Sequence, residues 1–404
     1  MVPSRHCLDS QHGTNEREIV TTTLELAWSE VGAEAELLAK MSAFPIWTDD
    51  GSWITSEFAQ NERGVLPHHG SWMVGDLPAI LWFLATGGGD TDNGATWSER
   101  ALQWSERLTN RTGLTSFASV AHMFFRGTLV GLAAGHEERL RPLAMAAAKT
   151  VSGRFLEIGY MKSFGTPADT QYPFTTVDDV INLAVPLWYA QRTGQEGLSD
   201  TALAAVHLIA DQLVRPDGST GQVLLFDSSG EPDGIDTYQG YSPDGCWSRG
   251  QAWGIYGFAA VHRLTGDPRC LEVADRMADY WIDRVQDEPA PLWDFDLPED
   301  ETPIRDTFAA SLAYAGILAL ADLSSSKRSG QLRSYATRML EALSLQHVIG
   351  NPRGHGILSG AALDVPHSHG IGASVIVGDS YYTEALWRLR TSGENENSLP
   401  VFPQ

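Results

Sequence analysis

The segment QYPFTTVDDVINLAVPLWYA at residues 171–190 places two neighbouring acids at the start of an expected helix. Asp178 and Asn182 are four residues apart, so they share a helix face with the apolar Ile181, whereas Asp179 points about 100° away. A carboxyl held against apolar surface has a raised pKa, which a general acid at neutral pH requires. We therefore interpret Asp178 as a candidate general acid, Asn182 as its neighbour in the site, and Asp179 as an acid that stabilises the helix N-terminus.

A second cluster of aromatic and planar polar residues lies in DTYQGYSPDGCWSRGQAWGIYGF, at the opening of another expected helix. Its candidate binding residues are Gln239, Trp247, Arg249 and Trp253. An aromatic face matches the apolar C–H face of a sugar ring, and a guanidinium offers a planar fork for a carboxylate. The alternative for Arg249 is a salt bridge to a local acid such as Asp244.

Other polar groups have simpler interpretations. Asp306 stands at the start of an expected helix with Arg305 as its simplest partner, and the segment VIVGDSYYTEALWRL at 375–389 is interpreted mainly as scaffold. His367 and His369 have no third ligand at metal-binding spacing, so no metal site is expected. The sequence also contains neither a Gly-rich phosphate loop nor a nucleophile elbow.

Apolar residues recur at helical spacing in about twelve segments. These segments span about 16–42, 73–86, 95–109, 116–134, 137–154, 177–193, 197–213, 248–265, 268–285, 305–323, 328–344 and 372–391. Long connections rich in Trp, Asp, Gly and Pro alternate with short ones. Six helical hairpins with long loops on one side predict an all-α fold, an (α/α)6 barrel or six-hairpin toroid whose cavity those loops line. The alternative is an α-solenoid or an irregular bundle. Pro186 is expected to kink or break its helix, and GQVLLFD at 221–227 is the best strand candidate.

The composition limits the class of function. The chain has 404 residues with 28 Lys and Arg against 51 Asp and Glu, a net charge of -23 that disfavours nucleic-acid and membrane-surface partners. No apolar run approaches the roughly 20 residues of a membrane span, and no secretory signal is apparent. We predict a cytoplasmic protein that binds a small molecule, with a flexible segment at 1–15, one domain over 16–391 and a tail at 392–404.

Four segments, in this order along the chain, resemble the unsaturated glucuronyl hydrolases, glycoside hydrolase family 88. They are VDDVINLAVPLWYA, TYQGYSPDGCWSRGQAWGIYGF, WDFD followed by RDTFAAS, and GDSYYTEAL. DGST at 217–220 and the pattern of Trp72, Gly75 and Pro78 also fit, so the resemblance covers most of the chain from about 70 to 390. The run Trp-Ser-Arg-Gly-Gln-Ala-Trp-Gly is its most specific part, and the resemblance implies a six-hairpin α/α barrel.

The resemblance also implies an unusual reaction. Such enzymes act on oligosaccharides whose terminal uronic acid has a C4–C5 double bond. An Asp protonates the vinyl ether at C4 and activates water for C5, and the resulting hemiketal opens and expels the remaining sugar without a cofactor or metal. By position, Asp178 resembles this general acid/base and Gln239 a contact to a substrate hydroxyl or water. Arg249, Trp247 and Trp253 resemble part of the wall that lines the substrate site.

The sequence departs from the family at a second active-site Asp. In the family this Asp lies in a His-Asp-Leu-Gly-Phe-like stretch, which aligns here with Ala118-Ser119-Val120-Ala121-His122, so Ser119 takes its place. Losing one of two carboxylates lowers the pKa of the other if like-charge repulsion had raised it. Asp76 and Asp179 are candidates to compensate.

Three further departures fall in the implied sugar pocket. An expected sugar-contacting His after DGST is Gln222, an expected Trp is Phe164, and a Gly-Phe-Trp-Pro pattern reads Gly75-Asp76-Leu77-Pro78. We therefore expect Ser119, Gln222, Phe164 and Trp72 to line the substrate site. Three hypotheses follow: hydration of an unsaturated uronyl saccharide, a related barrel recruited to another hydration, elimination or isomerisation of a sugar- or nucleoside-derived acid, or a non-catalytic carbohydrate-binding protein.

Overall fold

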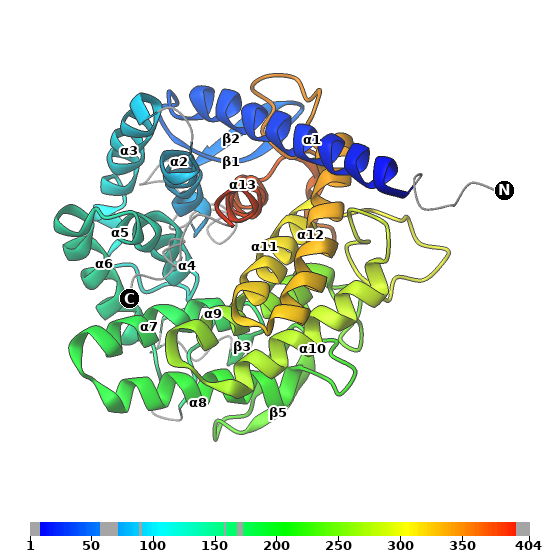
Figure 1. Cartoon of the computed structure of the whole chain (residues 1–404). Helices are drawn as coiled ribbons and strands as arrows, with labels where there is room; N and C mark the ends of the chain where they lie inside the picture. The colour runs from blue at the N-terminus through cyan, green and yellow to red at the C-terminus, as the bar shows by residue number, and fades with distance from the viewer. Residues whose placement is uncertain are drawn as a thin grey trace.

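The computed structural model describes residues 9–56, 72–88, 91–156, 159–166, 168 and 173–392, and its helices form a closed ring of hairpins (Figure 1). The inner helices are α2 (Asp76–Thr86), α4 (Val120–Phe124) continued by α5 (Val130–Ala133), α7 (Asp179–Thr193), α9 (Ser248–Thr265), α11 (Thr307–Leu323) and α13 (Ile376–Thr391). The outer helices are α1 (Asp9–Leu38), α3 (Thr91–Glu106), α6 (Glu137–Ser152), α8 (Glu196–Leu213), α10 (Pro268–Val285) and α12 (Ser326–His347). Each inner helix packs against its hairpin partner and against the next inner helix, and α13 closes the ring against α1 and α2.

The amino-acid pattern explains which helices lie inside. Helix α11 is rich in Ala and Leu and is buried almost all round, as a helix surrounded by other helices must be. Helix α10 instead buries one stripe, from Cys270 through Met277 to Val285, and exposes its charged face. This difference between inner and outer helices produces an (α/α)6 barrel, and the fold predicted from the sequence is confirmed.

All twelve predicted helical segments contain helix in the structure. Pro186, which was expected to kink or break its helix, does not break it, because α7 runs through that position to Thr193. The segment expected at 116–134 is divided, since the π-helical turn η4 (Phe125–Leu129) separates α4 from α5. Helix α1 begins at Asp9, seven residues before the predicted start at 16. The predicted C-terminal tail lies almost wholly outside the described residues, as do residues 1–8 of the predicted N-terminal segment.

The long connections carry short helical turns and small antiparallel sheets. The turns are η2 (Trp72–Gly75) and η3 (Thr109–Arg111), and the sheets are β1 (Phe44–Asp49) with β2 (Ser52–Ser56), β3 (Phe174–Thr176) with β4 (Val223–Phe226) and β5 (Pro232–Asp236), and β6 (Ala361–Asp364) with β7 (His369–Ala373). Strand β4 confirms the strand candidate at 221–227. The β3–β4 pairing fixes the chain just before α7 by joining Thr176 to Val223.

The described helices include none that is both long and apolar enough to cross a membrane.

Candidate active site

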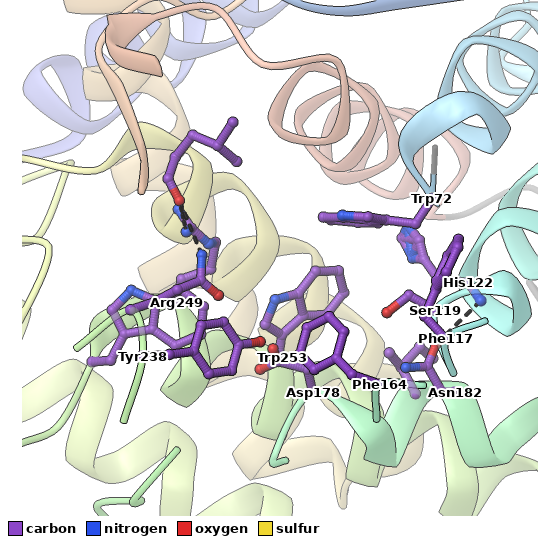
Figure 2. Close-up of a pocket in the computed structure, with 14 residues that line it drawn as sticks. Trp72, Phe117, Ser119, His122, Phe164, Asp178, Asn182, Tyr238, Arg249 and Trp253 are labelled. Atoms are coloured by element: carbon purple, nitrogen blue, oxygen red, sulfur yellow. Dashed lines mark hydrogen bonds between the residues drawn. The ribbon is translucent and has the colours of Figure 1, made fainter. Parts of the chain in front are cut away.

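A cavity lies where the long connections meet the first turns of α4, α7 and α9 (Figure 2). The space between its walls, including its open mouth, is about 640 Å³. The residues that line it are Trp72, Phe117, Ser119, His122, Phe164, Asp178, Ile181, Asn182, Tyr238, Gln239, Trp247, Arg249, Trp253 and Leu363. Nine of the ten residues that the sequence indicated are therefore brought together, and the exception is Gln222.

Asp178 directly precedes α7, and its carboxyl faces the cavity next to the hydroxyl of Tyr238 (Figure 2). The side chain is half-buried, and its Oδ1 is shielded from solvent without a hydrogen bond to the described part of the protein. Burial, and secondly the neighbouring Asp179 carboxylate, raise the pKa of Asp178 to about 8, although Arg249 opposes this. The raised pKa favours the protonated carboxyl at neutral pH, and Oδ1 has no hydrogen-bond partner among the described residues, which suits a general acid.

Asp179 points away from the cavity and organises the backbone that carries Asp178. Its carboxylate accepts hydrogen bonds from Thr176 N at 3.1 Å and from Asn182 Nδ2 at 2.9 Å, and also from Ser163 Oγ. Asn182 in turn accepts from the backbone N–H of His122 at 3.2 Å. Asp179 therefore stabilises the start of α7, as predicted, and also connects α7 to α4.

Arg249 lines the cavity, and its positive charge is balanced by Asp306, an acid that is distant in the sequence. Its Nη1 donates to Asp306 Oδ2 and to the carbonyl of Ala362, both at 2.8 Å, and its Nη2 donates to the carbonyl of Leu363. Three of its five N–H donors are thus used within the protein. The suggested partner Asp244 was wrong, and so was the pairing of Asp306 with Arg305. Asp306 also caps α11 through the N–H of Phe308.

Gln222 lies behind the cavity rather than in its lining, so its predicted position was wrong. Its Oε1 accepts hydrogen bonds from the backbone N–H groups of Tyr238 and Gln239, both at 3.0 Å. Gln239 does line the cavity, and its Nε2 donates to the carbonyl of Leu363 at 3.1 Å. Gln222 therefore fixes the loop that presents Tyr238 and Gln239, because its buried amide is satisfied by that loop's backbone.

Aromatic rings form much of the remaining wall. The ring centroids of Trp72 and Trp253 are 6.3 Å apart, and those of Phe164 and Tyr238 are 5.7 Å apart. Such rings suit stacking against the apolar face of a sugar. Sequence reasoning missed Phe117, Tyr238 and His122 as lining residues. Tyr238 was part of the aromatic cluster in the sequence, but nothing local distinguished it from Tyr241, which the fold leaves exposed.

Neither candidate for replacing the missing carboxylate at Ser119 lies in the cavity lining. The Asp179 carboxylate already accepts hydrogen bonds from Ser163, Thr176 and Asn182. Asp76 is completely buried behind the wall, 3.3 Å from His122 Nε2 and 3.3 Å from Arg126 Nε. Burial raises the pKa of Asp76 to about 7 although the adjacent Arg126 opposes it.

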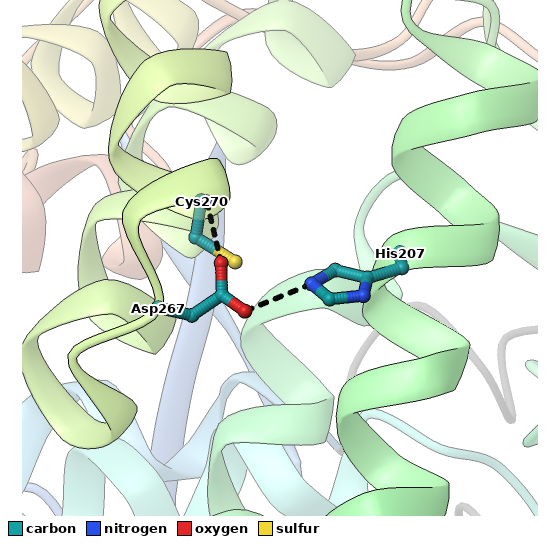
Figure 3. Close-up of side chains that lie close together, drawn as sticks. All are labelled: His207, Asp267 and Cys270. Atoms are coloured by element: carbon teal, nitrogen blue, oxygen red, sulfur yellow. Dashed lines mark hydrogen bonds and ion pairs between the residues drawn. The ribbon is translucent and has the colours of Figure 1, made fainter.

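Among the described residues, one group of side chains could act as metal ligands, and it lies between α8 and the start of α10 (Figure 3). It consists of His207, Asp267 and Cys270 and lies outside the cavity lining. Asp267 Oδ1 accepts from the backbone N–H groups of Arg269 and Cys270, and Oδ2 is 3.1 Å from His207 Nε2. The carboxylate thus acts as a helix cap paired with a histidine. His367, one of the two histidines noted in the sequence, pairs with Asp364 at 2.8 Å.

The closed ring of helical hairpins thus carries, at one end, a carboxyl with a raised pKa among aromatic side chains. The chain is 28% identical over 335 residues to an unsaturated glucuronyl hydrolase from Bacillus sp. strain GL1, covering 81% of this chain and 89% of that protein. It is 27% identical over 254 residues to an unsaturated chondroitin disaccharide hydrolase from Streptococcus pneumoniae, covering 61% of this chain and 64% of that protein.

The solved structures agree with these sequence relatives. The crystal structure of the unsaturated glucuronyl hydrolase from Bacillus sp. GL1 superimposes with a TM-score of 0.81 at 26% identity, covering 91% of this chain and 96% of that one. No model of a known protein family matches the chain. The chain is thus similar to the unsaturated glucuronyl hydrolases along most of its length, and the resemblance inferred from its sequence motifs is confirmed.

Proposed function

We propose that this protein is a glycoside hydrolase that hydrates the C4–C5 double bond of an unsaturated uronyl saccharide, with Asp178 as general acid/base. The observation that carries the proposal is the Asp178 carboxyl, which faces an aromatic-lined cavity with a raised pKa and no protein partner for its Oδ1. The similarity to unsaturated glucuronyl hydrolases supplies the substrate class. The substrate is a small saccharide. That the protein is cytoplasmic, and that it has no nucleic-acid, membrane or cofactor partner, stays a prediction.

In the proposed reaction, the Asp178 carboxyl donates its proton to C4, and the positive charge that forms is shared between C5 and the ring oxygen. A water molecule adds to C5 and gives a proton back to the Asp178 carboxylate, so the acid is regenerated. The C5 hemiketal then opens to a ketone as its bond to the ring oxygen breaks. The hydroxyl this leaves on C1 forms an aldehyde while the remaining sugar departs with a proton. One water is consumed and no redox change occurs.

The residues around Asp178 have separate parts in this proposal. Trp72 and Trp253 stack against the sugar, Phe164 and Trp247 complete the aromatic wall, and Gln239 contacts a hydroxyl or the water. Arg249 keeps its positive charge at the wall while Asp306 holds it in place.

The proposal is tested by following the ultraviolet absorbance of the double bond with unsaturated disaccharides derived from glycosaminoglycans, alginate and pectin. Purified protein is expected to remove the absorbance of at least one of them, and the Asp178→Asn variant is expected not to. Binding without consumption of any disaccharide would instead support a non-catalytic carbohydrate-binding protein.

The pH dependence of the reaction follows from the state of Asp178. Because its pKa is raised to about 8, the acid is mostly protonated below this pH and loses its proton above it. We expect kcat/KM to fall about tenfold per pH unit above about pH 8, when measured by initial rates with protein that remains folded. The groups that face Asp178 and set this limit are Asp179, Tyr238 and Arg249. An alkaline decline beginning near pH 5 would show that Asp178 is not the acid.

A substitution at Ser119 tests whether the barrel catalyses the proposed hydration or has been recruited to a different reaction. Ser119 lines the cavity at the position of the second active-site Asp in the resembling family. If the protein hydrates unsaturated uronyl saccharides, the Ser119→Asp variant is expected to raise kcat/KM, because it restores the carboxylate that the resembling family has at this position. Loss of activity in a variant that stays folded and keeps its binding would favour the recruited reaction.

A further inference from the structure

His122 is a cavity residue that the proposed mechanism does not use. It lies in α4, its side chain is 2% exposed, and its ring packs edge-on against both Trp72 and Trp253 at centroid distances of 5.1 and 5.3 Å. Figure 2 shows it beneath Trp72, on the same side of the cavity as Ser119 and across from Tyr238. A buried imidazole so tightly enclosed has a fixed orientation.

The two ring nitrogens of His122 have different surroundings. Nε2 is 3.3 Å from Asp76 Oδ2, and the other oxygen of Asp76 is 3.3 Å from Arg126 Nε. Nδ1 is shielded from solvent and has no hydrogen bond to the described part of the protein. While Asp76 is a carboxylate it accepts the Nε2 proton, so Nδ1 carries a lone pair that is free to accept a hydrogen bond. Buried polar atoms usually have a partner, and because His122 is a lining residue of the cavity, a ligand hydroxyl bound there can supply one for Nδ1.

Asp178 Oδ1 is a second orphaned polar atom on the same cavity wall. The two groups differ in protonation, because burial and the nearby Arg126 charge lower the pKa of His122 well below its usual value while the pKa of Asp178 is raised. Between the pKa of Asp76, about 7, and that of Asp178, about 8, the cavity thus offers a protonated carboxyl and a neutral imidazole whose Nδ1 is an acceptor. A base that resists protonation this strongly suits hydrogen bonding better than proton uptake.

We propose that His122, oriented by Asp76, accepts a hydrogen bond from one hydroxyl of the unsaturated uronyl sugar through Nδ1 and is a specificity-determining residue of this site. This inference rests on the proposed function. His122 takes the place of the carboxylate missing at Ser119 and does so without adding a negative charge to the cavity. Asp76 is a positioning residue, because it touches His122 and not the sugar.

The first test uses the unmodified protein. Analogues of the disaccharide that each lack one hydroxyl of the unsaturated sugar are compared with the parent compound. We expect one analogue to have a KM about 10-fold higher than the parent, the size typical of one lost hydrogen bond of about 1.4 kcal/mol. The His122→Phe variant is expected to raise KM for the parent by the same factor, with a smaller change in kcat, and to show no further loss with that analogue.

A double variant tests the exchange of acceptors. Ser119→Asp combined with His122→Phe is expected to recover part of the binding lost in His122→Phe alone. His136→Phe is the control, since His136 also stacks on a tryptophan, Trp82, but lies outside the cavity lining. Binding to Asp178→Asn protein by calorimetry, with and without His122→Phe, separates affinity from turnover.

The possible results separate this inference from the proposed function. Turnover that persists with unchanged KM and affinity in folded His122→Phe protein overturns the role of His122 and leaves the function standing. The role of His122 is also overturned if every deoxy analogue raises KM equally in the unmodified protein and in His122→Phe, because no single hydroxyl then depends on His122. Unmodified protein that neither binds nor consumes any unsaturated disaccharide overturns the function, and the inference falls with it. If His122→Phe fails to fold, the wild-type analogue series decides, together with His122→Gln.

Discussion

Replacing Asp178 with asparagine is expected to lower turnover of an unsaturated uronyl disaccharide by about 10³-fold or more, the upper part of the range for loss of a general acid. Asparagine has nearly the same shape, and the Asp178 Oδ1 makes no hydrogen bond that the change would break among the described residues. Affinity should therefore change little while the absorbance of the double bond persists. The matched control is Asp244→Asn, an exposed acid on the loop before α9, which should keep full activity. Activity within tenfold of the unmodified protein would contradict the assignment.

The same variant is expected to be more stable than the parent at alkaline pH. The pKa of Asp178 is raised in the folded protein from 3.8 to about 8, so the folded state holds a proton that the unfolded chain releases. The stability that this proton provides is complete below about pH 4 and is lost as the pH rises through about 8. The asparagine side chain of the variant does not titrate and has no such dependence. With allowance for the partial exposure of the side chain, we expect a gain of about 2 kcal/mol at pH 8.5 and none near pH 4, measured by urea unfolding. An equal gain at both pH values would point to packing instead.

These two expectations have a common physical origin. The site keeps a carboxyl in surroundings that disfavour its charge, so a group useful for proton donation costs stability when it ionises. Asp179 adds to this effect by placing a second carboxylate beside it, while its own charge is stabilised by Ser163, Thr176 and Asn182. Neighbouring acids in one sequence thus have different roles because their surroundings differ: Asp178 faces the cavity, and Asp179 accepts hydrogen bonds that hold the start of α7.

Local sequence signals were sufficient for most of the fold. The boundaries of α9 and α10 were predicted correctly, since Gly266 adopts a positive φ of 74° after α9 and Asp267 caps α10 ahead of Pro268. The π-helical turn after α4 was not predicted, because hydrophobic periodicity does not distinguish it from an α-helix. Pro186 does not break α7, because the packing of α7 against its neighbours outweighs the cost of one missing hydrogen bond.

The candidate site was predictable where a residue and its function lie in one segment. Asp178 directly precedes α7 and Asn182 lies in its first turn, and Trp247, Arg249 and Trp253 lie together at the start of α9. The partners of these residues were not predictable. Asp306 lies 57 residues from Arg249, and Asp76 lies 46 residues from His122, so only the closed barrel brings either pair together. Gln222 was misplaced for the same reason, because its partners Tyr238 and Gln239 lie 16 and 17 residues further along the chain.

The largest effect on stability is expected from Glu384 on α13, which lies in a buried ion network behind the cavity. Its carboxylate is inaccessible to solvent and contacts Arg126, accepts from Arg388 Nη2 at 2.8 Å, and accepts from the Tyr256 hydroxyl at 3.0 Å. Although burial opposes it, Glu384 is held at a lowered pKa by these two guanidinium groups. The network continues through Arg126 to Asp76 and so to the cavity wall.

The Glu384→Gln variant is expected to lose about 3–5 kcal/mol of unfolding free energy at pH 7, because it leaves the buried Arg126 with too little compensating charge. The loss should shrink as the pH falls toward and below the pKa of Glu384, since a carboxyl with a lowered pKa contributes its stability only while it is ionised. Urea unfolding at pH 7 and pH 4 measures both effects. Glu272→Gln on the exposed face of α10 removes the same charge and should cost less than about 0.5 kcal/mol. A loss below about 1 kcal/mol for Glu384→Gln would show that the network is not needed for stability. If its kcat/KM with the unsaturated disaccharide also stayed unchanged, the orientation of His122 would not depend on the charges behind Asp76.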